Sequence, residues 1–578
     1  MSAARQEVRY QRVREAENDG REEEDEGEVT VHLYSHSSRP VVRAHCRDAS
    51  LRICSSLLLL AVAIGFVLYE LEYGALAPHS AQPSFYGHLG ATWNISTLES
   101  SLTVTTSHNS HHHHSEEEDH QHGDSEHSHS AGTYHLAAAV TDSDSCSRVA
   151  RDVLESGGLV VDAGVAAVLC LTVLHSHSVS IGGVFTSIYF NGTTQNASVL
   201  NTIPIDASPI PYGIPTVLQG LWSLHQAHGR KPWSELFSPA VHLARQGFLM
   251  DSSLHAALEK NQMKITSSES LQRLFYDGNS LKTVGASVAN VQLGDVLEIA
   301  RNMVDPALPD AIIQKLLSDI AVTDRETFRE TLSMGHPISS DPVQIHLDGF
   351  TLFSSSVPTS GRILSSSVQE VYQRHKNMSS ATISEILINS LKAMYQVAGA
   401  WPPDPTENGS AAGVRSQQDV APVGSNVLVA DSNGDLLVIS LTLNSTFGSG
   451  FVSPSTGILL SDFVQGTASV VSPTVLFWAC PSVLLGSDNE VMGLAGRGGS
   501  SLPFSLAQVL LSQVLLQTDL PESINWTMPD FTPADSDPWL RYFGLHGGEP
   551  ETRMAIEVRA EHVHVVTAPS CSCHHAGL

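Results

Sequence analysis

The chain has 578 residues, a formal net charge of −29 at pH 7 and 42% hydrophobic residues. Its length is sufficient for a large buried core together with additional segments. The acidity excludes a nucleic-acid-binding protein, because contact with a phosphate backbone requires a basic surface.

A largely apolar run at residues 53–69 is the first distinctive feature. Its 17 residues are at the lower limit of the roughly 17–25 that cross a bilayer. Nine arginines lie in residues 1–52, whereas Lys and Arg are absent from residues 53–147. Because positive residues stay on the cytosolic side, we interpret residues 53–70 as the transmembrane signal anchor of a single-pass type II membrane protein. Residues 1–52 are then a disordered cytosolic tail, and the C-terminal domain is extracellular or lumenal.

Two other interpretations of this run are weaker. A cleaved signal peptide would begin near the N-terminus and end in small residues, and this run does neither. A buried core helix would not account for the bias in charge on its two sides.

Glycosylation sequons and cysteines agree with the proposed orientation. All seven Asn-x-Ser/Thr sequons lie after the apolar run, where glycosylation occurs. We expect glycans at Asn94, Asn191, Asn196, Asn377, Asn408 and Asn525, and the remaining sequon begins at Asn444. Five cysteines also follow the run, in a compartment that permits disulfides: Cys146, Cys170, Cys480, Cys571 and Cys573.

Residues 71–134 form a polar stalk that ends in a tract rich in histidine and acidic residues, 108–129. Imidazole and carboxylate groups bind zinc or copper. A defined metal site also needs fixed geometry, which a low-complexity stretch does not supply, so we interpret the tract as a solvated linker.

The composition becomes that of a globular protein from about residue 135. Helical periodicity occurs at residues 161–174, 295–304, 311–320 and 383–395, and strands are expected at 184–190 and 555–566. Helices that precede and separate strands favour helices packed on both faces of stacked sheets. A polar loop at residues 402–422 separates two halves of this region, and its composition indicates the exposure that a processing site needs.

Residues 424–462 follow that loop and contain the candidate catalytic segment. Apolar residues alternate after Ser425, an Asp-Ser-Asn-Gly turn comes at residues 431–434, and a second apolar run occupies residues 436–443. This pattern predicts a β-hairpin with a potential nucleophile, Ser425, at the start of its first strand. A glycine-rich loop, residues 447–450, then returns to the same end.

The chain resembles the gamma-glutamyltransferase (glutathione hydrolase) family over much of residues 135–500. Details of the second half, such as the Trp-Ala-Cys-Pro block, are most similar to the family's divergent sixth vertebrate type. The matching blocks are residues 162–167, 177–178, 181–183, 228–230 and 244–248 in the first half, and 441–444, 447–449, 453–460 and 478–481 in the second.

The resemblance implies an Ntn-hydrolase-like four-layer αββα sandwich made from a precursor that cuts itself. Residues 135–424 would be the heavy-subunit-like region and residues 425–578 the light-subunit-like region of a heterodimer. The freed hydroxyl residue attacks the gamma-glutamyl amide, and its own α-amine is the general base, so no cofactor or metal is expected. The resemblance also implies a disulfide between Cys146 and Cys170.

The family's site transfers to this chain only in part. Without gaps, the family's catalytic threonine falls on Gly424, one position before Ser425. Ser425, Thr442 and Gly496 are the catalytic candidates, and Asn444 and Asp462 are the substrate-binding candidates. The family's carboxylate-binding arginine has no basic equivalent in residues 201–204, its serine pair becomes Phe477 and Trp478, and its second oxyanion glycine becomes Arg497.

Three functions follow as hypotheses. The first is a membrane-anchored hydrolase or transferase that acts on extracellular glutathione, its conjugates or other gamma-glutamyl compounds. The second is an uncleaved, catalytically inactive glycoprotein scaffold of the same fold. The third is a metal-binding surface protein that uses the histidine tract.

The C-terminal cysteines and histidines leave two possibilities open. Cys480 could form a disulfide with Cys571 or Cys573, which we favour, and the second possibility is zinc. The spacing around residues 571–575 is not one of the usual structural zinc patterns.

Overall fold

A computed structural model describes residues 132–204, 210–375, 423–463, 477–499, 502–525 and 552–578. These residues belong to one compact unit, His122–Leu578. The expected signal anchor, cytosolic tail and histidine tract lie outside the described residues. Within the described part of the chain, no helix is both long enough and apolar enough to cross a bilayer.

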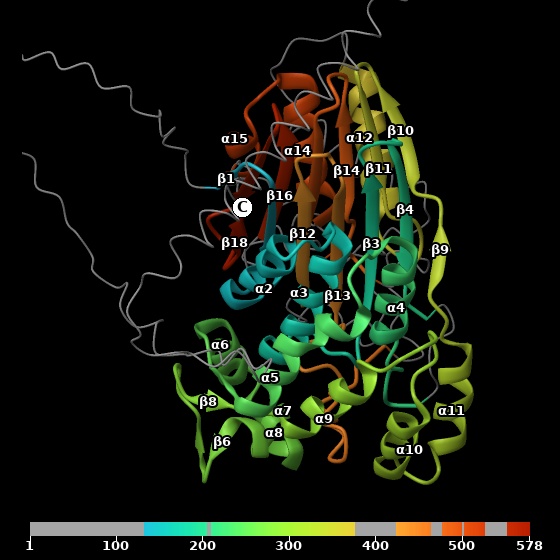
Figure 1. Cartoon of the computed structure of the whole chain (residues 1–578), viewed down its shortest axis with the longest axis vertical. Coiled ribbons are helices and arrows are strands. Elements are labelled where there is room, and N and C mark those ends of the chain that lie inside the picture. Colours follow the sequence, from blue (N-terminus) through green and yellow to red (C-terminus); the bar gives the residue numbers. More distant parts are fainter. Residues whose placement is uncertain (1–131, 205–209, 376–422, 464–476, 500–501, 526–551) are drawn as a thin grey trace, which may run out of the picture. The chain divides into compact units, whose positions relative to one another are not determined.

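Two antiparallel sheets of seven strands form the centre of this unit (Figure 1). The first sheet has the order β1 (Thr133–Tyr134), β17 (His562–Thr567), β16 (Thr552–Arg559), β15 (Val491–Arg497), β14 (Ser482–Gly486), β11 (Phe350–Ser354) and β10 (Val343–Leu347). The second has the order β18 (His574–Gly577), β2 (Ala137–Thr141), β12 (Ser425–Asp431), β13 (Leu436–Thr442), β3 (Val184–Asn191), β4 (Asn196–Asn201) and β9 (Ile338–Ser340). The predicted hairpin therefore lies in the interior of a sheet.

The two sheets pack face to face through an apolar layer. Leu428 and Val438 of the second sheet meet Val483 and Ile556 of the first in one buried cluster. Alternate residues on the same strands, such as Val427, belong instead to a cluster formed with helices. Because successive side chains of a strand point to opposite faces, the β12–β13 hairpin is buried on both sides.

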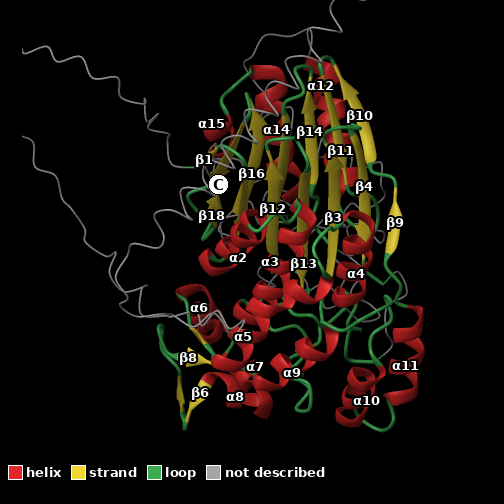
Figure 2. Ribbon diagram, viewed as in Figure 1, coloured by secondary structure: helices red, strands yellow, loops and turns green. Residues whose placement is uncertain are grey.

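Helices cover the outer faces of both sheets (Figure 2). α3 (Val160–Leu174) packs against β12 and β13 and is buried on all sides, as its almost wholly apolar sequence requires. α2 (Asp144–Glu155), α4 (Val217–His228), η3 (Trp233–Phe237) and α5 (Ser238–Gln246) complete that layer. α12 (Gly361–His375), α14 (Leu502–Leu516) and α15 (Leu520–Asn525) form the other layer. The α/β sandwich expected from the sequence is confirmed.

A smaller helical part continues from α5. It consists of α6 (Ser252–Lys260), α7 (Gln262–Ser267), α8 (Glu269–Phe275), α9 (Val291–Ala300), α10 (Asp310–Asp319) and α11 (Arg325–Met334), with two small two-stranded sheets, β5 (Phe248–Leu249) with β8 (Ser287–Val288) and β6 (Tyr276–Asp277) with β7 (Ser280–Leu281). Figure 2 shows these helices beyond one end of the sheet strands.

Most of the expected elements are present, with two corrections. The helix expected at residues 295–304 begins earlier, as α9, because the Asn290 side chain accepts the Leu293 N–H at 3.1 Å and caps it. The single strand expected at residues 555–566 is wrong: it is a hairpin, β16 and β17, that turns at Ala560 and Glu561. Both turn residues have positive φ, 49° and 65°, without the usual glycine or asparagine signal. The helix expected at residues 383–395 lies outside the described residues.

Candidate active site

The start of β12 is held by a regular antiparallel register. Ser425 is opposite Leu441 of β13, and the pairing continues without a bulge to Ala430 opposite Leu436. Thr442 fixes the incoming chain, because its Oγ1 donates to the Val423 carbonyl at 2.8 Å and accepts the Asn444 N–H at 2.8 Å. The predicted hairpin is confirmed, and Thr442 lies at the expected end of it.

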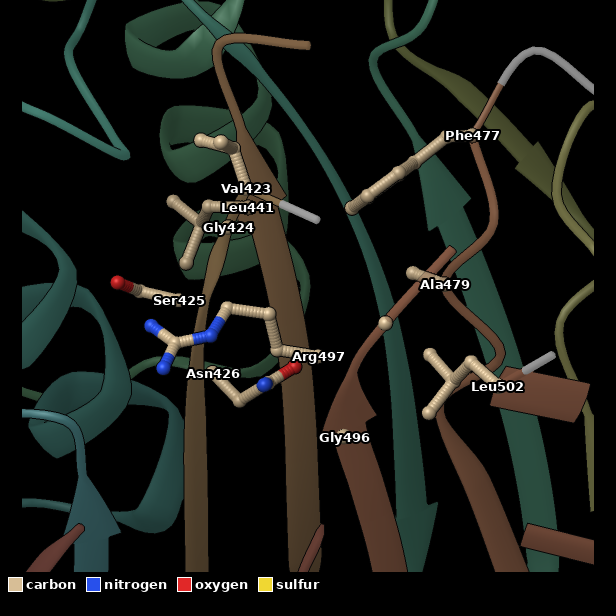
Figure 3. Close-up of a pocket in the computed structure, with 11 residues that line it drawn as sticks. Val423, Gly424, Ser425, Asn426, Leu441, Phe477, Ala479, Gly496, Arg497 and Leu502 are labelled. Carbon is tan, nitrogen blue, oxygen red and sulfur yellow. The ribbon is translucent and has the colours of Figure 1, made fainter. Parts of the chain in front are cut away.

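Ser425 points away from the space between the two sheets. Its Oγ lies 3.1 Å from the Ser178 Oγ, and the residue is 1% exposed. Its neighbour Asn426 lies on the opposite face, where its Oδ1 accepts the Ser440 hydroxyl at 2.7 Å. Figure 3 shows the two side chains leaving β12 in different directions. Gly424 shares the Asn426 face, since side chains alternate along a strand.

Gly424 leaves no room for a side chain. A Cβ atom placed on it would lie 2.7 Å from the carbonyl oxygen of Leu441, which belongs to the backbone and cannot rotate away. The position that the resemblance gives to the catalytic threonine is therefore a glycine that this backbone requires. Ser425 is one residue later, and a shift of one residue reverses the face of the sheet.

A small pocket lies beside Gly424 and Ser425 (Figure 3). Its opposite wall is formed by Phe477, Arg497 and neighbouring residues, and its cavity volume is about 10 Å³, roughly the space of one water molecule. Small-molecule sites usually have several hundred Å³. The full lining is Val423, Gly424, Ser425, Asn426, Leu441, Phe477, Ala479, Gly496, Arg497, Gly498 and Leu502.

Gly496 lies in the same pocket as Ser425, as the site prediction requires. A Cβ atom on Gly496 would lie 2.5 Å from the Thr552 carbonyl oxygen and 2.8 Å from Leu502 Cδ1, so the packing demands glycine. The next residue, Arg497, extends its guanidinium toward Ser425 (Figure 3). A cation thus enters the space that the family leaves to a second glycine.

Asn444 and Asp462, the two predicted substrate-binding residues, contact each other but do not line this pocket. The Asn444 Nδ2 donates to the Asp462 carbonyl at 3.4 Å. The Asp462 carboxylate accepts the Ser445 N–H at 3.2 Å and the Ser445 hydroxyl at 2.5 Å. Lys264 donates to the Thr446 and Gly448 carbonyls at 2.9 and 2.6 Å. These bonds hold the 445–448 turn closed.

A cluster of histidine and aspartate lies behind Ser425 and was not found from the sequence. His175 at the end of α3 and Asp251 at the start of α6 are 2.8 Å apart, Nε2 to Oδ2. Burial acts to raise the pKa of Asp251, but the hydrogen bond and charge of His175 outweigh it and lower this pKa to about 2. Burial, followed by the nearby His175 and Arg497, holds the pKa of His177 well below its usual value.

The disulfide implied by the resemblance is confirmed. Cys146 of α2 bonds to Cys170 of α3, with a Cα–Cα distance of 5.5 Å. The favoured partner of Cys480 is wrong, because Cys571 bonds to Cys573. Cys480 is buried in the cluster with α12 and α14, whereas Cys571 and Cys573 pack against the layer between the sheets.

Three expected glycosylation sites can be placed. Asn191 and Asn196 lie on the β3–β4 hairpin, where Asn191 is partly buried and Asn196 is exposed, and Asn525 is exposed at the end of α15. Asn94, Asn377 and Asn408 lie outside the described residues.

Residues 146–419 and 405–532 match the sequence model of the family described as Gamma-glutamyltranspeptidase. Glutathione hydrolase 6 of Rattus norvegicus is 31% identical over 460 residues, which are 78% of this chain and 81% of that protein. Glutathione hydrolase 6 of Mus musculus is 29% identical, over 78% and 80% of the two chains. Among solved structures, cephalosporin acylase from Bacillus halodurans has a TM-score of 0.60 at 16% identity, over 79% of this chain and 99% of that one. That likeness supports the fold alone.

Proposed function

Because this chain belongs to the gamma-glutamyltranspeptidase family, we propose that it is a membrane-anchored, glutathione hydrolase-like glycoprotein that remains uncut and does not hydrolyse glutathione. In this proposal the chain has the family's αββα sandwich and some of its site residues, such as Thr442 and Gly496. It lacks a nucleophilic side chain at residue 424, where the family has its catalytic threonine.

The observation that carries this proposal is the contact between Gly424 and Leu441. A hydroxyl side chain at residue 424 would face Gly496 and the space between the sheets, but its Cβ would collide with the Leu441 carbonyl at 2.7 Å. Ser425 has a hydroxyl, but this hydroxyl faces α3 and is hydrogen-bonded to the Ser178 hydroxyl. A nucleophile must lie within about 3–3.5 Å of the carbon that it attacks, and a serine on the opposite face of a sheet does not meet that requirement.

The substrate pocket supports the same conclusion. A gamma-glutamyl group carries an α-carboxylate and an α-amine, and a buried charge without a partner costs several kcal/mol. The described pocket has room for about one water molecule. Phe477 and Arg497 occupy the positions of one family serine and of the second oxyanion glycine. The Asp462 carboxylate already accepts a hydrogen bond from the Ser445 hydroxyl.

The membrane anchor and the glycans complete the proposal. The arginine-containing residues 1–52, the apolar residues 53–69 and the seven later sequons support a type II orientation. The exposure of Asn196 and Asn525 is compatible with glycans on the proposed outer side.

A slow hydrolase that uses Ser425 is the second candidate. One observation favours it: Ser425 and Gly496, the expected nucleophile and oxyanion donor, line one pocket. This candidate requires the Ser425 side chain to leave Ser178 and the first turn of β12 to rearrange. Arg497 could then contact the substrate carboxylate, since a guanidinium binds carboxylates in a bidentate manner.

An assay with a chromogenic gamma-glutamyl anilide distinguishes the two candidates. The full-length glycosylated chain, its Ser425→Ala variant and a Ser449→Ala control are compared at equal concentration. We expect all three to release product at the rate of buffer alone. Release that Ser425→Ala abolishes and Ser449→Ala preserves would establish the hydrolase and refute the inactive scaffold.

A further inference from the structure

Asp142 directly follows β2 and is 4% exposed. One of its carboxylate oxygens, Oδ2, accepts the Asn426 N–H at 2.8 Å. The other, Oδ1, is buried without a hydrogen-bond partner among the described residues. A buried carboxylate oxygen without a partner is unfavourable, so this atom is suited to a ligand that the protein alone does not provide.

The C-terminal segment brings two sulfur atoms to this oxygen. β18 pairs with β2 so that His574 is opposite Thr141, which places the preceding Cys573 beside Asp142. The Cys571 N–H donates to the Ala568 carbonyl at 2.9 Å and forms the turn that returns the chain to this point. One ligand atom each of Asp142, Cys571 and Cys573 lies within 4.8 Å of the others.

We propose that Asp142, Cys571 and Cys573 form a zinc-binding site when the two cysteines are reduced. Two thiolates and one carboxylate are common zinc donors, and three protein ligands leave the fourth tetrahedral position for water. Cys571 and Cys573 are half-buried, so solvent reaches them while Asp142 remains inside. The sequence disfavoured zinc here because the cysteine and histidine spacing at residues 571–575 is not a usual structural zinc pattern. Asp142, which is distant in the chain, was not among the expected ligands.

The metal and the disulfide are alternative states of this site. In the structure Cys571 is bonded to Cys573. Two molecules of a low-molecular-weight thiol would break this bond, giving one small-molecule disulfide and two protein thiols. Binding of Zn²⁺ then releases the two thiol protons, because the ligands are thiolates. Zinc binding is therefore expected only after reduction.

The zinc site would link the C-terminal segment to the end of β2, the strand that pairs with β12. Asp142 holds the backbone of Asn426, and β18 lies on the other side of β2. A ligand that binds only the folded state raises the unfolding temperature, by an amount that grows with the logarithm of its concentration relative to Kd. We expect Zn²⁺ to raise the melting temperature of the reduced protein and to leave that of the oxidised protein unchanged.

Cobalt is a suitable reporter, because thiolate–cobalt bonds absorb in the near ultraviolet and imidazole–cobalt bonds from the histidine tract do not. The full-length chain is used with Cys46 and Cys54 replaced by Ser, so that N-terminal thiols do not contribute. It is reduced under native conditions, where Cys146 and Cys170 are 0% exposed and protected. We expect one equivalent of Co²⁺ to produce the band and an equivalent of Zn²⁺ to remove it.

Variants assign the ligands. Cys571→Ser should reduce the band to about half, the double variant with Cys573→Ser should abolish it, and Asp142→Asn should weaken Co²⁺ affinity at least tenfold. His574→Asn removes an exposed imidazole of the same segment and should change nothing. If Asp142→Asn does not fold, Cys571→Ser and the double variant decide the question. A reduced protein without the band, or a band that survives the double cysteine variant, would overturn the site.

Discussion

The Ser425 hydroxyl lies 3.1 Å from the Ser178 hydroxyl, on the face of the sheet that packs against α3. The preceding residue, Gly424, is on the face toward Gly496, where a nucleophile would be needed. Under the proposed function, the absence of a side chain at residue 424 would leave the fold intact and remove the nucleophile.

The close contact at Gly424 predicts a loss of stability on substitution. Gly424→Ala places a Cβ atom 2.7 Å from the Leu441 carbonyl, so we expect the free energy of unfolding to fall by about 1–3 kcal/mol. Urea denaturation measures the change. Gly499→Ala is the matched control, because nothing lies within 4 Å of the added atom there, and it should change stability by less than about 0.5 kcal/mol. Equal effects of the two substitutions would contradict the packing account.

The His175–Asp251 pair predicts a dependence of stability on acidity. The folded-state pKa of Asp251 is lowered to about 2, below its usual value of about 3.9. Its contribution is therefore fully present above about pH 4 and is lost as the pH falls toward 2. Thermal unfolding from pH 5 to pH 2 should show a smaller decline for Asp251→Asn than for the native chain. Asp295→Asn, which removes an exposed partner of Arg245, should leave the decline unchanged; an equal decline in all three chains would refute the role of the pair.

Asp162 predicts a larger effect on stability. This fully buried carboxylate accepts the backbone N–H groups of Leu159, Arg230 and Lys231 at 2.8–3.2 Å, and His225 lies 3.4 Å from it. Asp162→Asn removes the charge that these donors surround, so we expect a loss of about 3 kcal/mol. Denaturant titration of the variant tests this value. Asp152→Asn on the partly exposed surface of α2 is the control, and a native-like midpoint for Asp162→Asn would contradict the expectation.

The Cys146–Cys170 disulfide predicts a stability gain from cross-linking. It closes a loop with a sequence separation of 24 residues, for which the chain-entropy estimate is about 3.5 kcal/mol. Replacement of both cysteines by alanine should lower the unfolding midpoint accordingly. If the double variant unfolds at the native denaturant concentration, this disulfide does not stabilise the domain.

Local patterns predicted much of the fold. The turn at residues 431–434 and the alternating residues on both sides of it predicted the β12–β13 hairpin. The glycine-rich residues 447–450 predicted the turn that follows it. The β16–β17 hairpin was missed because Ala560 and Glu561 adopt positive φ without a residue type that usually does so. Periodicity cannot reveal a turn of that kind.

The site was harder to predict, because its geometry depends on strand register and on distant pairs. The resemblance to the family proposed Ser425, Thr442 and Gly496 as catalytic candidates, but only the pairing of Ser425 with Leu441 determines the face on which the hydroxyl lies. His175 and Asp251 are 76 residues apart, and Asp142 meets Cys573 only through the β2–β18 pairing. No local pattern connects these partners.

The most direct test of the central claim is the size of the mature chain on a reducing gel after removal of glycans, with N-terminal sequencing of every band. The account predicts one polypeptide of about 62.0 kDa and no fragment that begins at Ser425. Two bands, the smaller beginning at Ser425 and absent from Ser425→Ala, would contradict it.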